Sequence, residues 1–392
     1  MFLEKEGKLI YSYDGETVCI EAWGKDALRV RATKNRSFTG RDWALEAKDA
    51  HAGEVEIFED PSAKGGAFAN MYEGTDTSYG KITNGKLHAV IDSGSVITFY
   101  HEDGRVLLKE HFRRLRDEES MPLNIMGREY SNGVGDNFRI VARFVARKGE
   151  KIFGMGQYQQ HELDLKGCML ELAQRNSQVS VPFYLSSIGY GFLWNNPGVG
   201  QVMFANNGTE WVTESGKEID YLVIAGDTPA EIEENYMTLT GKPPMMPEYG
   251  MGFWQCKLRY WNQEQLLSVA RKYKELGVPL DVIVVDFFHW TKQGEFKFDP
   301  KYWPDVPGMC RELKEMGIQV VVSVWPTVDI YSENFEEMKE KGYLVRTEHG
   351  VPLTMLCGGN EVFFDATNPD ARTYVWEKIK KNYYDQGAKL FW

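Results

Sequence analysis

The spacing of the apolar residues changes part-way along this chain, and that change limits the folds it can adopt. Up to about residue 245, apolar and polar residues alternate, as in ALRVRAT, where Leu28 and Val30 flank Arg29. A period of two is typical of a β-strand with one face buried and the other in solvent. Residues 1–245 are therefore predicted to form an antiparallel β-sandwich.

A second pattern follows the proline-rich segment GKPPMMPEYG (241–250), which is typical of a connector between domains. Helical segments that end at Gly277, Gly317 and Gly387 lead directly into the apolar strands LDVIVVD, IQVVVSVWP and AKLFW. This order indicates parallel strands covered by helices, in a (β/α) barrel or a doubly wound sheet. A (β/α)8 TIM barrel needs about 250 residues, so residues 246–392 are predicted to form an incomplete barrel, its first half.

The composition argues against several kinds of partner. The net charge of −12 disfavours binding to nucleic acid or to an anionic membrane. The five cysteines and seven histidines are scattered without a CxxC pair or a zinc pattern, so neither a metal nor another cofactor is expected. The N-terminal MFLEKEGKLIYSY lacks the apolar stretch of a signal peptide, and no apolar run approaches the roughly 18 residues of a membrane span. We expect a cytoplasmic protein with reduced thiols.

Chemistry in a barrel lies at the C-terminal ends of the strands, and two of those ends carry candidate residues. Asp286 closes the apolar strand in VVDFFHW, where its carboxylate would face the barrel mouth; a helix cap or a salt bridge is the alternative. Trp325 in SVWP either lines a pocket or packs in the core. His289 is expected to be a hydrogen-bonded loop histidine. The aromatic residues, 13% of the chain, suit sugar rings and equally suit a sandwich core.

Several segments, in their order and spacing, resemble glycoside hydrolase family 31, the retaining α-glycosidases. In the first half they are IFGMGQYQQHELDLKG and VPFYLSSIGYGFLWNNPG; in the second they are MGFWQCKLRYWNQEQLL, LDVIVVDFFHW, FDPKYWPDVPGMCRELKEMGIQVVVSVWP and FFDATNPDAR. The resemblance covers nearly the whole chain and implies a galactose-mutarotase-like sandwich followed by a TIM barrel. The DFFHW and SVWP variants resemble the α-xylosidase branch more than the DIDYM-type α-glucosidases.

The resemblance also implies roles for five residues. Asp286 matches the strand-end aspartate that hydrogen-bonds the sugar in the −1 subsite of the family. Trp325 and Trp254 match aromatic positions that line this pocket. Phe287 and His289 follow the aspartate and complete the implied substrate-binding set.

No catalytic residue is expected within the chain itself. The family's nucleophilic Asp would fall about two positions after Trp392, with the acid/base Asp further on, and a retaining glycosidase needs both carboxylates. The chain alone is therefore expected to be inactive. The function favoured is hydrolysis of α-linked glycosides by retaining double displacement, first as an α-xylosidase. The alternatives are an α-glucosidase, an α-transglycosylase or a non-catalytic carbohydrate-binding fragment; the partner is an oligosaccharide or small α-glycoside, and a homo-oligomer is left open.

Overall fold

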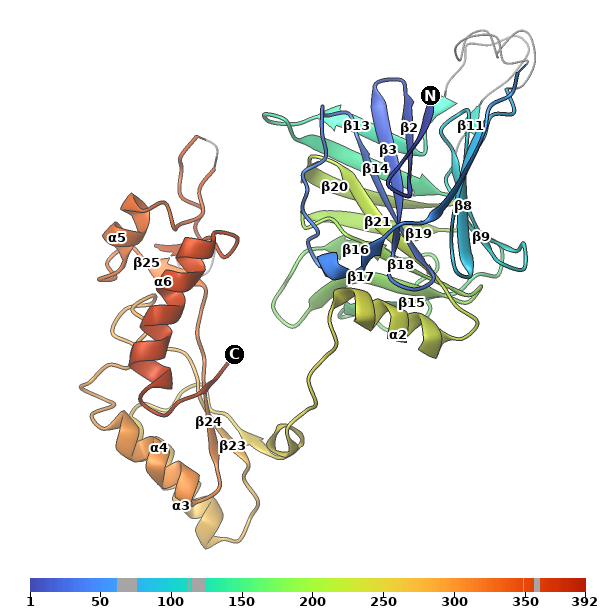
Figure 1. Ribbon diagram of the computed structural model, residues 1–392. Coiled ribbons are helices and arrows are strands. Elements are labelled where there is room, and N and C mark those ends of the chain that lie inside the picture. The colour runs from blue at the N-terminus through green and yellow to red at the C-terminus, as the bar shows by residue number, and fades with distance from the viewer. Residues whose placement is uncertain (62–75, 112, 115–123, 348, 356–359) are drawn as a thin grey trace. The chain divides into compact units, whose positions relative to one another are not determined.

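The chain divides into two compact units, Met1–Pro243 and Pro244–Trp392, and the division lies within the proline-rich connector (Figure 1). The computed structural model describes residues 1–61, 76–111, 113–114, 124–347, 349–355 and 360–392. Cys357 lies outside these ranges, and the other four cysteines are free thiols. None of the described helices is long and apolar enough to cross a membrane.

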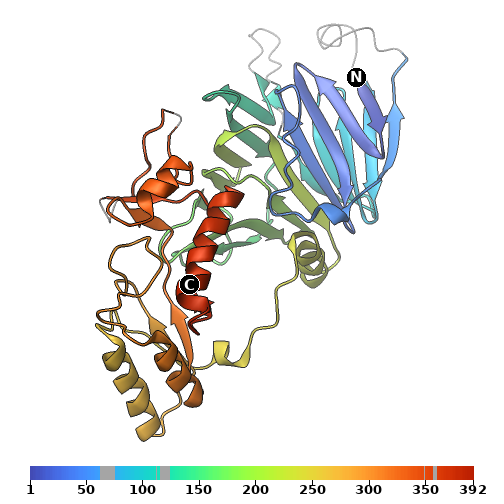
Figure 2. The same ribbon diagram turned by 60° about the vertical axis from the view of Figure 1, so that its left-hand side comes forward.

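The first unit is a sandwich of antiparallel sheets, as predicted (Figure 2). Its largest sheet runs in the order β1 (Phe2–Lys5), β2 (Lys8–Tyr13), β3 (Glu16–Trp23), β4 (Ala27–Thr33), β21 (Ile219–Ala225), β18 (Tyr190–Trp194), β17 (Val179–Ser186) and β15 (Ile152–Gln157), with β5 (Ala50–His51) beside β3. A second sheet contains β10 (Val106–Lys109), β9 (Ile97–His101), β8 (Leu87–Asp92), β7 (Tyr79–Asn84) and β6 (Glu54–Phe58). A third contains β13 (Arg128–Asn132), β14 (Phe138–Phe144), β20 (Gly208–Gly216), β19 (Gly200–Ala205) and β16 (Met169–Leu172), and β11 (Arg113–Arg114) pairs with β12 (Asn124–Ile125).

Aromatic side chains fill the space between these sheets. Phe192 of β18 stacks on Trp211 of β20 at 5.1 Å, and Phe144 of β14 meets Tyr221 of β21 edge-on at 5.4 Å. All four rings are buried in one core that residues of all three large sheets share. Much of the aromatic content therefore serves sandwich packing, the second of the two uses expected for it.

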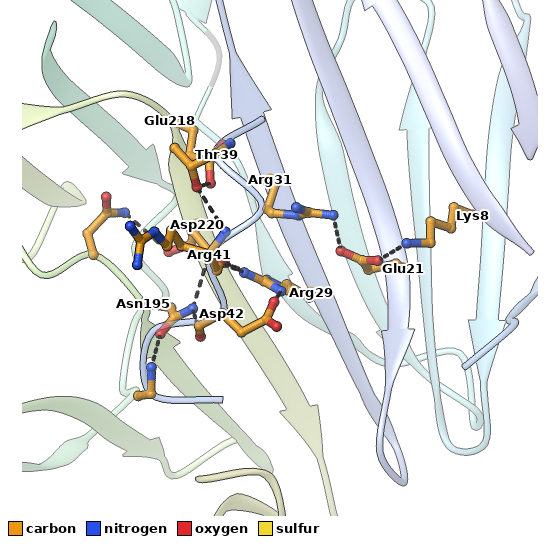
Figure 3. A network of polar contacts seen from close by, with 12 residues as sticks. Lys8, Glu21, Arg29, Arg31, Thr39, Arg41, Asp42, Asn195, Glu218 and Asp220 are labelled. Atoms are coloured by element: carbon orange, nitrogen blue, oxygen red, sulfur yellow. Dashed lines mark hydrogen bonds and ion pairs between the residues drawn. The ribbon is translucent and has the colours of Figure 1, made fainter. Parts of the chain in front are cut away.

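Strand β4 departs from the expected half-buried pattern, because its polar face is also covered. Helix α2 (Pro229–Thr240) packs on the outer face of the largest sheet, and the segment after β4, which includes a short 3-10 helix (Ala47–Asp49), crosses the same region. Arg29 is consequently 0% exposed and makes two bonds to Asp220, from Nε to Oδ1 at 3.0 Å and from Nη2 to Oδ2 at 2.6 Å (Figure 3). A buried charge is tolerated when it is paired in this way.

The second unit contains a parallel sheet whose strand order is β22 (Trp254–Gln255), β23 (Val282–Val285), β24 (Gln319–Val322) and β27 (Leu390–Phe391). A 3-10 turn (Glu248–Met251) precedes it, and β25 (Thr327–Asp329) pairs with β26 (Glu361–Phe363). The helices are α3 (Gln263–Glu275), α4 (Val306–Glu315), α5 (Phe335–Glu340) and α6 (Pro369–Ile379), and α6 continues into a π-helical turn, η3 (Lys380–Tyr384). In the described residues this sheet has four parallel strands, half of the eight in a closed barrel.

The helix boundaries follow the expected signals. The side chain of Asn262 caps α3 by accepting from the Gln265 amide at 2.8 Å, and Asn368 caps α6 with Pro369 in its first turn. The glycine after α3, Gly277, has a φ of 68°, and Gly317 after α4 has a φ of 74°. Left-handed backbone of this kind suits glycine, and it turns each helix into the next strand.

Candidate functional site

Three residues follow the C-terminal ends of parallel strands: Asp286 after β23, Trp325 after β24 and Trp392 after β27. Trp254 begins the short strand β22 and is in register with Val282, the first residue of β23. Because the strands are parallel, these ends share one edge of the sheet. The candidate site therefore consists of the Asp286 carboxylate and the Trp325 and Trp392 rings at this edge, together with Trp254, whose ring stacks on Trp392.

The carboxylate of Asp286 has two partners within the second unit. Oδ1 accepts a hydrogen bond from the amide of Phe287 at 2.8 Å, and Oδ2 accepts one from Sγ of Cys256 at 3.4 Å. A carboxylate offers about four acceptor positions, so the side chain keeps capacity for hydroxyl groups of a ligand. Asp286 is half-buried, and neither a helix cap nor a salt bridge to it occurs among the described residues.

Aromatic rings flank this carboxylate. Phe287 stacks on Trp325 with ring centres 5.3 Å apart and planes inclined by 11°, and Trp290 meets Trp325 edge-on at 6.4 Å. Trp254 of β22 stacks on Trp392, which follows β27, with ring centres 6.4 Å apart, and these two rings are 37% and 53% exposed. Flat apolar faces beside a hydrogen-bond acceptor suit a ligand that has both C–H and O–H groups.

His289 does not belong to the accessible part of the site. Its side chain is 1% exposed; Nδ1 lies 2.9 Å from the backbone oxygen of Asp286, and Nε2 lies 2.9 Å from the hydroxyl of Tyr383. Burial lowers the pKa of His289 to about 4, so the ring is neutral near pH 7. The direct ligand contact implied by the family resemblance is therefore set aside, and the hydrogen-bonded loop histidine is what the structure contains.

The sequence did not indicate two residues that contact Asp286 or His289. Cys256 follows β22, and its pKa is raised to about 11 by burial first and then by the hydrogen bond to Asp286. Tyr383 lies in the π-helical turn, 94 positions from His289. A lone cysteine and one of 20 tyrosines give no sequence signal, because only the fold brings them to the strand ends.

The sequence also did not indicate Arg259, whose guanidinium lies over two aromatic rings. The guanidinium of Arg259 lies 4.0 Å from the ring centre of Trp261 and 5.1 Å from that of Phe288, and its Nη1 donates to the Phe288 oxygen at 3.0 Å. Phe288 has a φ of 64°, which costs a bulky residue conformational energy. The Phe288 ring contacts that of Phe287, with centres 4.1 Å apart, so these rings continue the aromatic surface beside Asp286.

The first unit has a pocket of its own, of about 550 Å³. Trp43 lies at its edge, 48% exposed, and the amide of Asn195 holds the backbone on both sides of this residue. Oδ1 of Asn195 accepts from the Ala44 amide at 3.3 Å, and Nδ2 donates to the Asp42 oxygen at 3.1 Å (Figure 3). The pocket is mainly apolar and offers no acid–base group. No cluster of potential metal ligands occurs in the described parts of either unit.

Comparison with known proteins decides the family. Residues 17–202 match the glycosyl hydrolase 31 N-terminal galactose mutarotase-like domain, and residues 243–392 match the glycosyl hydrolases family 31 TIM-barrel domain. A relative from Pseudescherichia vulneris, named an uncharacterized family 31 glucosidase ORF2, is 43% identical across 100% of this chain and 72% of its own length. The chain belongs to glycoside hydrolase family 31.

Two further family 31 relatives carry α-xylosidase names. Alpha-xylosidase A of Aspergillus niger is 31% identical across 96% of this chain. The crystal structure of a GH31 α-xylosidase from a soil metagenome, complexed with xylose, is 47% identical and superimposes on the whole chain with a TM-score of 0.89. The chain spans 51% of the Aspergillus protein and 57% of the soil protein, about half of each.

Proposed function

We propose that the strand ends around Asp286 bind the sugar of an α-linked glycoside, and that the protein is a retaining glycosidase of family 31. The observation that carries this proposal is the Asp286 carboxylate, which has free acceptor capacity and lies beside Phe287 and Trp325. Hydrogen bonds from sugar hydroxyls to a charged acceptor contribute about 1.5–3 kcal/mol each. The C–H faces of the sugar would lie against the rings.

Within this proposal we favour an α-xyloside as the substrate. Xylose lacks the C6 hydroxymethyl group of glucose, and the large rings of Phe287, Phe288 and Trp290 supply bulk next to the binding carboxylate. Two of the relatives described above are named α-xylosidases, and one of them is complexed with xylose, which supports the same choice.

The alternatives are an α-glucosidase or an α-transglycosylase with the same site, and the Pseudescherichia relative is named a glucosidase. A non-catalytic sugar-binding protein is the alternative from a different class.

Retaining hydrolysis uses two carboxylates about 5–5.5 Å apart, and the four described strand ends supply one, Asp286. We therefore propose that the 392-residue chain supplies the sugar-binding part of this glycosidase activity and by itself binds sugar without hydrolysing it; its cytoplasmic location stays a prediction.

Sugar binding to the 392-residue chain tests the proposal. Tryptophan fluorescence should report binding of methyl α-xyloside, with a lower dissociation constant than for methyl α-glucoside. Asp286→Asn should abolish the signal, while Asp370→Asn, an exposed N-terminal residue of α6, serves as the matched control. Tighter binding of the glucoside would favour the α-glucosidase. Equal binding by the wild type and Asp286→Asn would refute the site, and release of nitrophenol from an aryl α-xyloside would refute the proposed inactivity.

A further inference from the structure

The peptide unit between Asp286 and Phe287 is held from both sides. Its N–H group donates to Oδ1 of Asp286 at 2.8 Å, and its carbonyl oxygen lies 2.9 Å from Nδ1 of His289. A carbonyl oxygen only accepts, so Nδ1 carries the proton. Because one peptide plane contains both groups, a rotation of this plane would carry the N–H away from Oδ1 and release the carboxylate.

His289 is in turn held by Tyr383. Nε2 lies 2.9 Å from the Tyr383 hydroxyl, and with the proton on Nδ1 it accepts the hydrogen bond that this hydroxyl donates. Both side chains are 1% exposed, so water does not replace either partner. The two bonds together select the Nδ1–H tautomer, and they fix the ring in one orientation.

Tyr383 belongs to a π-helical turn, and the turn contacts the same loop at a second point. Nδ2 of Asn382 donates to the backbone oxygen of Phe296 at 3.0 Å, and within the loop the Asp299 amide donates to the His289 oxygen at 2.8 Å. A π turn inside a helix is rare and is often found at functional sites. Here two successive residues of η3 brace the segment that carries Asp286.

We propose that Tyr383 is a positioning residue for sugar binding, which acts through His289 to set the orientation of the Asp286 carboxylate. The inference rests on the proposed function, in which Asp286 binds the sugar. Tyr383 does not itself touch the ligand, because its hydroxyl is bonded to His289 and its ring is buried against Phe298. Its effect passes along a fixed chain: the tyrosine hydroxyl, the imidazole, the peptide carbonyl and the peptide N–H on the carboxylate.

The test compares Tyr383→Phe with Tyr384→Phe in the 392-residue chain, using methyl α-xyloside as the probe. Tyr383→Phe keeps the buried ring and removes only the hydroxyl. Tyr384 lies in the same turn, but its ring contacts Trp376 and not His289. We expect the dissociation constant to rise about fivefold to tenfold in Tyr383→Phe, the loss of roughly one hydrogen bond, and to stay unchanged in Tyr384→Phe.

The hydrogen bond at His289 Nε2 is the readout that a merely structural role would not move. Nitrogen-15 NMR of histidine-labelled wild type should show the Nδ1–H form, with the signal assigned through His289→Gln. In Tyr383→Phe the Nε2 resonance should shift, because Nε2 loses the hydrogen bond that the hydroxyl donates, while the Asp286 carbonyl keeps the proton on Nδ1. The Nε2–H form in the wild type would overturn the inference even if Tyr383→Phe failed to fold.

Asp286→Asn separates the inference from the proposed function. Loss of xyloside binding in Asp286→Asn together with wild-type affinity in Tyr383→Phe would overturn the role of Tyr383 and leave the proposed function intact. Unchanged affinity in Asp286→Asn would overturn the proposed function. Weakened binding in both Asp286→Asn and Tyr383→Phe, with Tyr384→Phe unchanged, supports the positioning role.

Discussion

The thiol of Cys256 donates to Oδ2 of Asp286 at 3.4 Å, although 30 positions separate the two residues. They follow adjacent parallel strands, β22 and β23, so the sheet itself brings them together. Partial burial of the sulfur disfavours the thiolate form, and that form would also place a second negative charge beside the carboxylate; the pKa of Cys256 is accordingly raised to about 11. The thiol thus acts as a neutral donor that occupies one acceptor position of Asp286.

Cys256 should therefore react slowly with alkylating reagents despite its exposed position. Only the thiolate is nucleophilic, so at pH 8 we expect iodoacetamide to modify Cys256 at least about tenfold more slowly than an unperturbed thiol. Asp286→Asn removes the neighbouring charge and should accelerate the reaction several-fold. Peptide mass spectrometry measures the rate at each cysteine separately.

Cys168 in the first unit is the internal control for this experiment. It is half-buried, and its pKa is raised by burial and by nearby carboxylates other than Asp286. Its rate should be the same in the wild type and in Asp286→Asn. A fast reaction at Cys256 in the wild type, or no change in Asp286→Asn, would show that the Cys256–Asp286 hydrogen bond does not form in solution.

The sequence predicts those parts of this fold that depend on local signals. Asn262 and Gly277 bound helix α3 because a cap and a left-handed glycine act on the nearest backbone. Asp286 could be recognised because it ends an unbroken apolar strand, and the C-terminal strand ends of a barrel carry its chemistry.

The parts that could not be predicted depend on distant segments. The face of β4 that carries Arg29 looked solvent-exposed because alternation reports polarity, while the partner that permits its burial, Asp220, lies 191 positions away. His289 was placed among the ligand contacts, yet the residue that encloses it, Tyr383, lies 94 positions further on. Local pattern cannot supply either pairing, because each requires the tertiary fold.

Loss of the Arg29 side chain should destabilise the sandwich strongly. Arg29→Met leaves Asp220 buried without its cation, and breaking a buried pair in this way costs about 3–5 kcal/mol in the free energy of unfolding. Burial already raises the pKa of Asp220 to about 6, so the carboxyl of the variant can take up a proton. The loss of stability should therefore be smaller at pH 5 than at pH 8.

Guanidinium denaturation of the chain measures this loss of stability. Hydrogen exchange of the β21 amides, monitored at each guanidinium concentration, assigns the loss to the first unit. Arg139→Met is the matched control, because Arg139 forms an exposed ion pair with Glu214 at 3.3 Å. Such surface pairs contribute about 0–1 kcal/mol. Equal effects of the two substitutions would contradict the importance of the buried pair.

The stacked pair of Phe287 and Trp325 should contribute to sugar affinity. Trp325→Leu keeps an apolar side chain but removes the flat ring, and we expect methyl α-xyloside to bind about fivefold more weakly, the loss of an aromatic contact of about 1 kcal/mol. Isothermal titration calorimetry measures the affinity. Trp376→Leu is the control, because this 46% exposed ring lies on α6 away from the strand ends. Equal affinities in both variants would exclude Trp325 from the site.

Protonation of His289 should make the second unit less stable in mild acid. Burial lowers the pKa of His289 to about 4, while the unfolded chain has an ordinary histidine pKa of about 6.5. The unfolded state therefore binds the proton first. The stabilisation is fully present above pH 6.5 and is lost as the pH falls toward 4. The loss should be about 2 kcal/mol between pH 7 and pH 5.

The groups that face the ring do not offset this loss. The Tyr383 hydroxyl is neutral, since burial holds its pKa well above the usual value, and Asp286 presents its backbone oxygen. Hydrogen exchange of the β23 amides, corrected for the intrinsic effect of pH, measures the local stability. His289→Gln should remove this pH dependence, whereas His161→Gln, on an exposed loop of the first unit, controls for loss of a histidine. An unchanged pH slope in His289→Gln would show that His289 is not buried as a neutral ring.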